Sequence, residues 1–418
     1  MPTAAGSTRK LTFAVWACVA LICLSAAGYW GWNRLQERQF RQRCEEARRN
    51  EDWRSEREIA KSWAAWDPAA NDPWWRAAEA AQELEDPEDV AFCLGHVQEN
   101  DPKFLFAFVE KANLEWTVLN RPLEALETSQ LIISKDPKVA EIQSRLISFY
   151  AMTLQRVELI KSIRAAIAVR AEPREAYTYL ILADSLSFAN GADLNGRWLA
   201  ACPDDLRFKI GLAVSTSESI FRNADVAASA NAAELEQEAD RQLKWFLESA
   251  SHNPALLTYL MNRAYEGGNV GRIGELLQKV DDSGVNDHMV WVYRGWYHME
   301  MKELADAELA LQEALRLHSL SGLAHHEYAR LLRLMQRPEA EVEQQQRIAR
   351  SGKQLRGKLI LQQNARDVPL EVFDEIISYA QECGDNLVAE GLSRRLNRPL
   401  GKSAETVSTD GSSAPNTR

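Results

Sequence analysis

Residues 100–137 read NDPKFLFAFVEKANLEWTVLNRPLEALETSQLIISKDP, with an Asp-Pro pair near each end. Between the two pairs, apolar side chains recur at helical spacing, and a polar turn at Asn120-Arg121-Pro122 interrupts them once. Proline ends a helix and, after aspartate, begins a turn. The stretch therefore predicts two helices folded into a hairpin.

The same prolines recur along the chain at a nearly constant interval. Pro68, Pro102, Pro137 and Pro173 lie 34, 35 and 36 residues apart, and the first three follow aspartate. A period of this length indicates stacked supersecondary units, because one such unit is too small to bury its own apolar face. Stacks of this kind present an extended surface, so the period favours a binding scaffold over a catalytic pocket.

Composition supports a folded helical protein. The 418 residues are 46% hydrophobic and 26% charged, which excludes general disorder. A formal net charge of -11 repels the phosphate backbone, so we expect no nucleic-acid partner. The six cysteines include no Cys-x-x-Cys pair, and we therefore expect no disulfide framework, no metal site and no cofactor.

The N-terminal region contains one long apolar segment. Residues 11–32, LTFAVWACVALICLSAAGYWGW, carry no charge and are long enough to cross a bilayer. The sequence thus predicts a short tail over 1–10, a transmembrane helix from Leu11 to Trp32 and a single-pass membrane protein. A cleaved signal peptide, with cleavage after Ala27, is the alternative. The side of the membrane that carries the repeats stays open, because basic residues flank both ends of the segment.

Residues at fixed positions in several units resemble the tetratricopeptide repeat, whose pattern is W-x2-L-G-x2-Y, then A-x3-F, then proline. The most complete copy has Arg294 and His298 where Leu and Tyr are usual, and it matches at Trp291, Gly295, Ala307, Leu311 and Ala314. A second copy matches at Trp74, Ala77, Ala78, Ala81, Ala91, Leu94 and Pro102. The resemblance covers residues 37–355.

The resemblance implies an all-α fold: a right-handed solenoid of about eight or nine helix pairs. We expect it to be irregular at 174–254, where one unit has only 30 residues and the next is overlong, with an expanded loop around Ser217–Ala233. Residues 356–400 are predicted to be capping helices, and 401–418 a disordered tail because they offer no apolar cluster to bury.

The resemblance also implies that peptides bind in a concave groove lined by the first helix of each pair. The candidate groove residues are first-helix positions outside the packing pattern: Val292, Trp296, Met299, His326, Arg330 and Arg333. Residues 328–358 hold eight basic residues against three glutamates. The candidate basic patch comprises Arg337, Arg347, Arg350, Lys353, Arg356 and Lys358, which could bind an acidic peptide. Solvated surface is the competing interpretation for both sets.

Five tryptophans lie within 23 residues of each other, namely Trp53, Trp63, Trp66, Trp74 and Trp75. Trp63 and Trp74 occupy packing positions of the repeat. Trp53 or Trp75 is a candidate for an interface.

Catalytic motifs are absent from the sequence. His326-Glu327-Tyr328-Ala329 begins like the His-Glu-x-x-His motif of a metalloprotease, but Arg330 stands where the second histidine is needed. We therefore expect no catalytic residues, and interpret the chain as a non-enzymatic, membrane-anchored scaffold for protein or peptide partners. An exported cell-envelope assembly factor is the alternative. The identity of the partners and the oligomeric state stay open.

Overall fold

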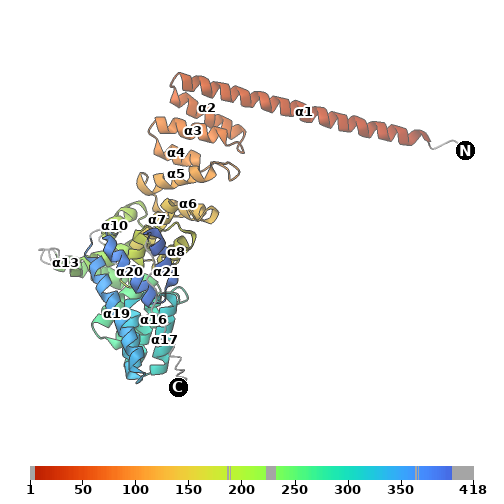
Figure 1. Ribbon diagram of the computed structural model, residues 1–418. Helices are drawn as coiled ribbons and strands as arrows, with labels where there is room; N and C mark the ends of the chain where they lie inside the picture. Colours follow the sequence, from red (N-terminus) through yellow and green to blue (C-terminus); the bar gives the residue numbers. More distant parts are fainter. Residues whose placement is uncertain are drawn as a thin grey trace, which may run out of the picture. The chain divides into compact units, whose positions relative to one another are not determined.

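The computed structural model describes residues 5–185, 188, 190–222, 232–362, 365 and 367–397 (Figure 1). Throughout these residues all regular secondary structure is helical, which confirms the prediction of an all-helical chain. The predicted tail at 401–418 lies outside the described residues. The chain divides into two compact units, residues 1–129 and residues 130–418.

Unit 1 consists of helical hairpins. Its helices are α1 (Ala5–Arg49), α2 (Trp53–Trp66), α3 (Asp72–Glu83), α4 (Pro87–Leu94) and α5 (Phe104–Thr117), and α6 (Pro122–Lys135) crosses into unit 2. Each of the first five packs on its neighbour in the chain. The core is built from small residues around one large ring, Trp63, and it includes Cys44, Ala60, Ala77, Ala78, Cys93 and Ala107. Small side chains allow the helices to approach closely.

The prediction of a single-pass membrane protein is wrong, because among the described residues no helix combines the length and the apolar character needed to qualify as a membrane span. The apolar segment Leu11–Trp32 belongs to a helix that continues without a break to Arg49. Its later part carries charges such as Glu37 and Arg41 and packs on α2 through Phe40 and Cys44. Half of the side chains of Leu11–Trp32 lie outside the described residues.

Unit 2 continues the hairpins and is larger. Its helices are α7 (Ala140–Met152), α8 (Arg156–Val169), α9 (Glu175–Ile181), α10 (Gly191–Ala201), α11 (Leu206–Arg222), α13 (Ala232–Ser249), α14 (Pro254–Glu266), α15 (Val270–Leu277), α16 (His288–Glu300), α17 (Leu304–Leu317), α18 (Gly322–Leu334), α19 (Glu339–Ile360), α20 (Leu370–Glu382) and α21 (Asn386–Arg395). The expected loop around Ser217–Ala233 is wrong at both of its ends, because α11 stays helical to Arg222 and α13 begins at Ala232. Residues 223–231 lie outside the described residues.

A recurring turn with a left-handed residue joins the two helices of a hairpin. Within each of two runs, the positive-φ residues are 34 or 35 residues apart: Glu51, Glu85, Asn120 and Leu154, then Gly268, Lys302 and Gln336. At each of these residues except Asn120, the next backbone N–H bonds to a carbonyl five residues back, as from Asp52 to Ala47 at 2.9 Å and from Glu303 to His298 at 2.8 Å. This is the Schellman termination of a helix. The interval of 34 or 35 residues therefore recurs in the backbone conformation of these turns, even at turns that contain no glycine.

Unit 2 closes on itself, since its last helices pack on its first. Helix α21 contacts α8, and α19 contacts α9, as Figure 1 shows for α21 (blue) beside α8 (yellow-green). Arg164 donates two hydrogen bonds, at 3.2 and 2.5 Å, to the carboxylate of Asp385, which lies 221 residues later. A simple stack contacts only neighbouring repeats. The closure brings distant segments of the chain face to face.

The closure gives a stability test at one glycine. A Cβ on Gly391 of α21 would lie 2.6 Å from Ile167 Cγ2 and 2.7 Å from Tyr177 Oη. We expect Gly391→Ala to destabilise unit 2 by about 1–3 kcal/mol because the contact is overpacked. Gly357→Ala in α19 is the matched control. It meets nothing within 4 Å and should stabilise the helix by up to about 1 kcal/mol.

Urea denaturation of the full chain would measure both changes, with hydrogen exchange of α21 as the local readout. Equal stabilisation by the two substitutions would contradict a tight contact between α21 and α8.

Candidate functional site

A buried arginine connects four segments inside unit 2. Arg156, 6% exposed, donates from Nη1 to Asp287 Oδ2 at 2.5 Å and from Nε to the carbonyl of Ala183 at 2.7 Å. The same Nη1 lies 3.3 Å from Thr258 Oγ1 of α14. Asp287 also caps α16 by accepting from the N–H of Met289. Arg156 therefore holds the segment after α9 next to the start of α16.

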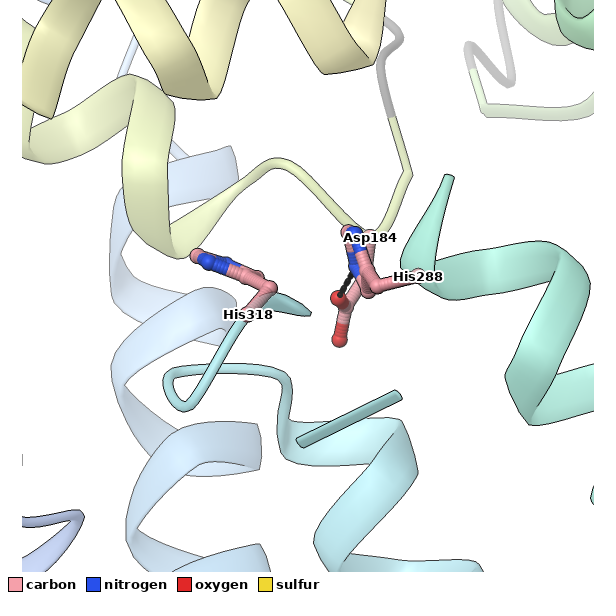
Figure 2. A group of neighbouring side chains, drawn as sticks. All are labelled: Asp184, His288 and His318. Carbon is pink, nitrogen blue, oxygen red and sulfur yellow. Dashed lines mark hydrogen bonds and ion pairs between the residues drawn. The ribbon is translucent and has the colours of Figure 1, made fainter. Parts of the chain in front are cut away.

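The residues that follow Ala183 and Asp287 meet in a cluster of one carboxylate and two imidazoles. Figure 2 shows Asp184, after α9, beside His288 at the start of α16, with His318 from the end of α17. His288 Nε2 lies 2.9 Å from Asp184 Oδ1, and the N–H of Leu323 donates to Asp184 Oδ2 at 3.2 Å. The two imidazole rings are 4.7 Å apart between centroids. Both histidines are 1% exposed.

The environment sets the charges in this cluster. Burial opposes ionisation of Asp184, but the hydrogen bond from His288 and the nearby charges of His288, His318 and Arg356 outweigh it and hold its pKa below the usual range. Burial, helped by the charges of His288 and Arg164, lowers the pKa of His318 to about 3. At neutral pH the cluster thus contains an ionised carboxylate and a neutral His318.

A cavity of about 650 Å³ opens beside the cluster. Its apolar lining includes Ile181, Leu320 and Leu323, and three cations of α19 project along it: Arg350, Lys353 and Arg356. Asp184 is the one carboxylate among its lining residues. A second cavity, of about 470 Å³, shares Asp184 and Arg356 with the first.

Close helix packing shapes this cavity at a glycine of α19. A Cβ on Gly352 would lie 2.6 Å from Tyr379 Oη, and that hydroxyl donates to the carbonyl of Leu320 at 3.1 Å. Only a glycine allows α19 to come this near to Tyr379. The cationic face of α19 is therefore held over the segment that begins α18.

The structure divides the predicted groove residues. Val292, Trp296 and Met299 are at most 6% exposed and belong to the hydrophobic core, so their assignment to an open groove is corrected. They face inward because α16 is packed by α14, α17 and α18. His326 is exposed and lines the cavity. The remaining two lie on α18, Arg330 paired with Glu300 and Glu327, and Arg333 on the surface.

The predicted basic patch is divided as well. Arg337 pairs with Glu308, and Lys358 pairs with Glu375. Arg347 is exposed and does not line the cavity. The structure brings His326 together with the other three members, Arg350, Lys353 and Arg356.

Several residues of the site escaped sequence reasoning. Asp184 and His288 are 104 residues apart and belong to no common motif. Tyr265 lines the same cavity from α14, and its hydroxyl donates to the buried Glu327 at 2.5 Å. Burial, together with the charge of Glu327 and this hydrogen bond, raises the pKa of Tyr265. The available signal was the irregular unit after Pro173, where α9 has only seven residues and leaves Asp184 outside a helix.

Unit 1 has a cavity of its own, of about 640 Å³. Trp75 lines it, and its ring is stacked 6.2 Å from that of Phe106. Lys103 is the one cation of the lining, against the acids Glu79, Glu85, Asp86 and Glu110. The placement of Trp75 fits its prediction as an interface residue, which stays a prediction, whereas Trp63 is buried.

Arg156, the buried arginine that connects four segments, gives a second stability test. Arg156→Met would leave Asp287 buried without its charged partner, and we expect a loss of about 3–5 kcal/mol in the free energy of unfolding. Lys161→Met on the same helix is the control. Lys161 is 75% exposed and its substitution should change stability by less than about 0.5 kcal/mol. Similar effects of the two substitutions in urea denaturation would show that the contacts of Arg156 do not hold these segments together.

The lowered pKa of His318 predicts a pH dependence. Between about pH 6.5 and 3, the unfolded chain binds a proton at His318 that the folded chain does not bind. Stability should therefore fall as the pH falls, by up to about 1.4 kcal/mol per pH unit from this group. His318→Gln should remove that part of the slope, whatever its effect at pH 7. An unchanged slope in urea denaturation from pH 7 to 4 would refute the assignment.

Comparisons with known proteins add little. No protein family model matches the sequence, and no curated protein matches it. Solved structures that resemble the fold include the Cut9–Hcn1 hetero-tetramer of the APC/C (11% identity, 86% of this chain and 90% of that chain, TM-score 0.31). Two others are a tetratricopeptide repeat protein from Parabacteroides merdae (12%, 61% and 98%, TM-score 0.26) and yeast Tom70 (12%, 86% and 88%, TM-score 0.28). These TM-scores are below 0.5, so the likenesses carry no argument about this chain.

Proposed function

We propose that this chain is a non-enzymatic protein-interaction scaffold of the tetratricopeptide type, a right-handed superhelix whose larger unit binds an acidic peptide segment. The observation that carries the proposal is the cavity of unit 2, where Arg350, Lys353 and Arg356 face Asp184 as the one lining carboxylate. A concave, partly apolar site with a few charged groups is the usual form of a ligand site.

Charge supports an acidic ligand. The overall charge of the chain is -11, yet the lining of this cavity is cationic. Neighbouring cations such as Arg337 and Lys358 are neutralised by ion pairs, whereas within the described part of the chain the three lining cations form no ion pair. A carboxylate entering the cavity would therefore meet cationic donors that no described carboxylate already neutralises.

The apolar lining supports a peptide in particular. Ile181 at the end of α9, Leu320 between α17 and α18, and Leu323 in the first turn of α18 line the cavity together and form an apolar wall for side chains between the acidic groups. The aromatic rings of Tyr265 and His326 also line this cavity. A small inorganic anion would leave this apolar area unused, whereas a peptide with alternating acidic and apolar residues would cover it.

Fluorescence anisotropy would test the proposal with ten-residue peptides that differ only in the number of Asp and Glu residues. We expect affinity to rise with the number of acidic residues and to fall with added salt. The double variant Arg350→Ala/Lys353→Ala should weaken binding at least tenfold, since each charged hydrogen bond is worth about 1.5–3 kcal/mol.

Arg347→Ala is the matched control, because Arg347 lies on the same helix and is exposed but does not line the cavity. It removes one positive charge and should change affinity less than twofold. Equal binding of acidic peptides and of their Asn and Gln counterparts, or equal losses in the two variants, would refute the proposal.

A further inference from the structure

We propose that Asp184, His288 and His318 form a binding site for one divalent metal ion of the zinc class. Each side chain offers one ligand atom, and the three atoms lie within 4.8 Å of one another. The site shares Asp184 with the lining of the cationic cavity, but none of the α19 cations is among its ligands, so the inference does not depend on peptide binding.

His318 supplies the observation that points to an ion. Its Nε2 lies 3.1 Å from the carbonyl oxygen of Leu180, and a carbonyl only accepts, so Nε2 carries the proton. Nδ1 then carries a lone pair, and it is buried without a hydrogen-bond partner among the described residues. An imidazole that donates one N–H to a backbone carbonyl and leaves the other nitrogen unpaired has the arrangement of a metal ligand.

Asp184 and His288 complete the donor set. Asp184 is ionised, and the N–H of Leu323 orients it through Oδ2, which leaves Oδ1 toward His288. An ion would replace the hydrogen bond between Asp184 Oδ1 and His288 Nε2, with the imidazole proton moving to Nδ1. Two imidazole nitrogens and one carboxylate oxygen match zinc, which takes three protein ligands and one further position.

The tertiary structure prepares this site before any ion arrives. Arg156 fixes the residue before Asp184 and the residue before His288, so two ligands are positioned by one guanidinium. Asp184 also lines the two cavities of about 650 and 470 Å³, which gives an ion a path from solvent. Because the ligands come from three separate segments, a bound ion would tie the closed form of unit 2 together.

Zinc binding to the full chain, first stripped with a chelator, is the direct test. We expect one Zn²⁺ per chain by calorimetry, and X-ray absorption of the zinc-loaded chain should show two imidazoles and oxygen ligands. His318→Gln and His288→Gln should each weaken zinc affinity more than about 100-fold, beyond the 10–100-fold typical of residues that only orient a ligand.

The exposed group His298, Glu303 and Asp306 provides the matched control, since its ligand atoms also lie within 4.8 Å of one another. His298→Gln should leave zinc affinity within twofold of the parent. Loss of binding in His298→Gln alone would assign the ion to the exposed group and overturn the proposal. Absence of zinc binding by the parent chain would also overturn the proposal, as would a zinc spectrum with fewer than two imidazole ligands. These two results do not depend on the folding of any variant.

Discussion

The buried guanidinium of Arg156 is the contact on which the interior of unit 2 depends. It binds the Ala183 carbonyl and the Asp287 carboxylate at once, and these two groups belong to segments more than a hundred residues apart. A buried arginine is costly unless its donors are satisfied, so the contact enforces one arrangement of α8, α14 and α16. Asp184 and His288 are the next residues in each segment, and their contact follows from that arrangement.

The helical hairpins repeat regularly along the chain, and the candidate site lies where this regularity is interrupted after α9. Hairpin turns with a left-handed residue recur every 34 or 35 residues, and they hold successive helices in similar geometry. The short helix α9 departs from this rule: it ends at Ile181, and residues 182–185 follow it as turns outside any helix. That segment carries Asp184. The zinc-class site and the edge of the cationic cavity both require this break in the pattern.

Sequence reasoning succeeded where the signal was local. The hairpin pattern predicted the helices. The density of basic residues on one stretch singled out Arg350, Lys353 and Arg356, which line one cavity but whose role in binding stays a prediction. It failed at Val292, Trp296 and Met299, because the repeat pattern marks which face packs within a pair and says nothing of a third helix that covers the other face. The apolar segment Leu11–Trp32 predicted a membrane span, and no helix among the described residues qualifies as one.

The sequence by itself determined that this chain is helical and repeated, and that positive charge is concentrated on residues 328–358, because helical periodicity, turn residues and charge density act over a few turns of chain. Only the tertiary structure decided which of those cations form ion pairs and that Asp184, His288 and His318 meet. The reason is closure of unit 2: α21 returns to α8 across 221 residues, and no local pattern encodes a contact between segments that far apart.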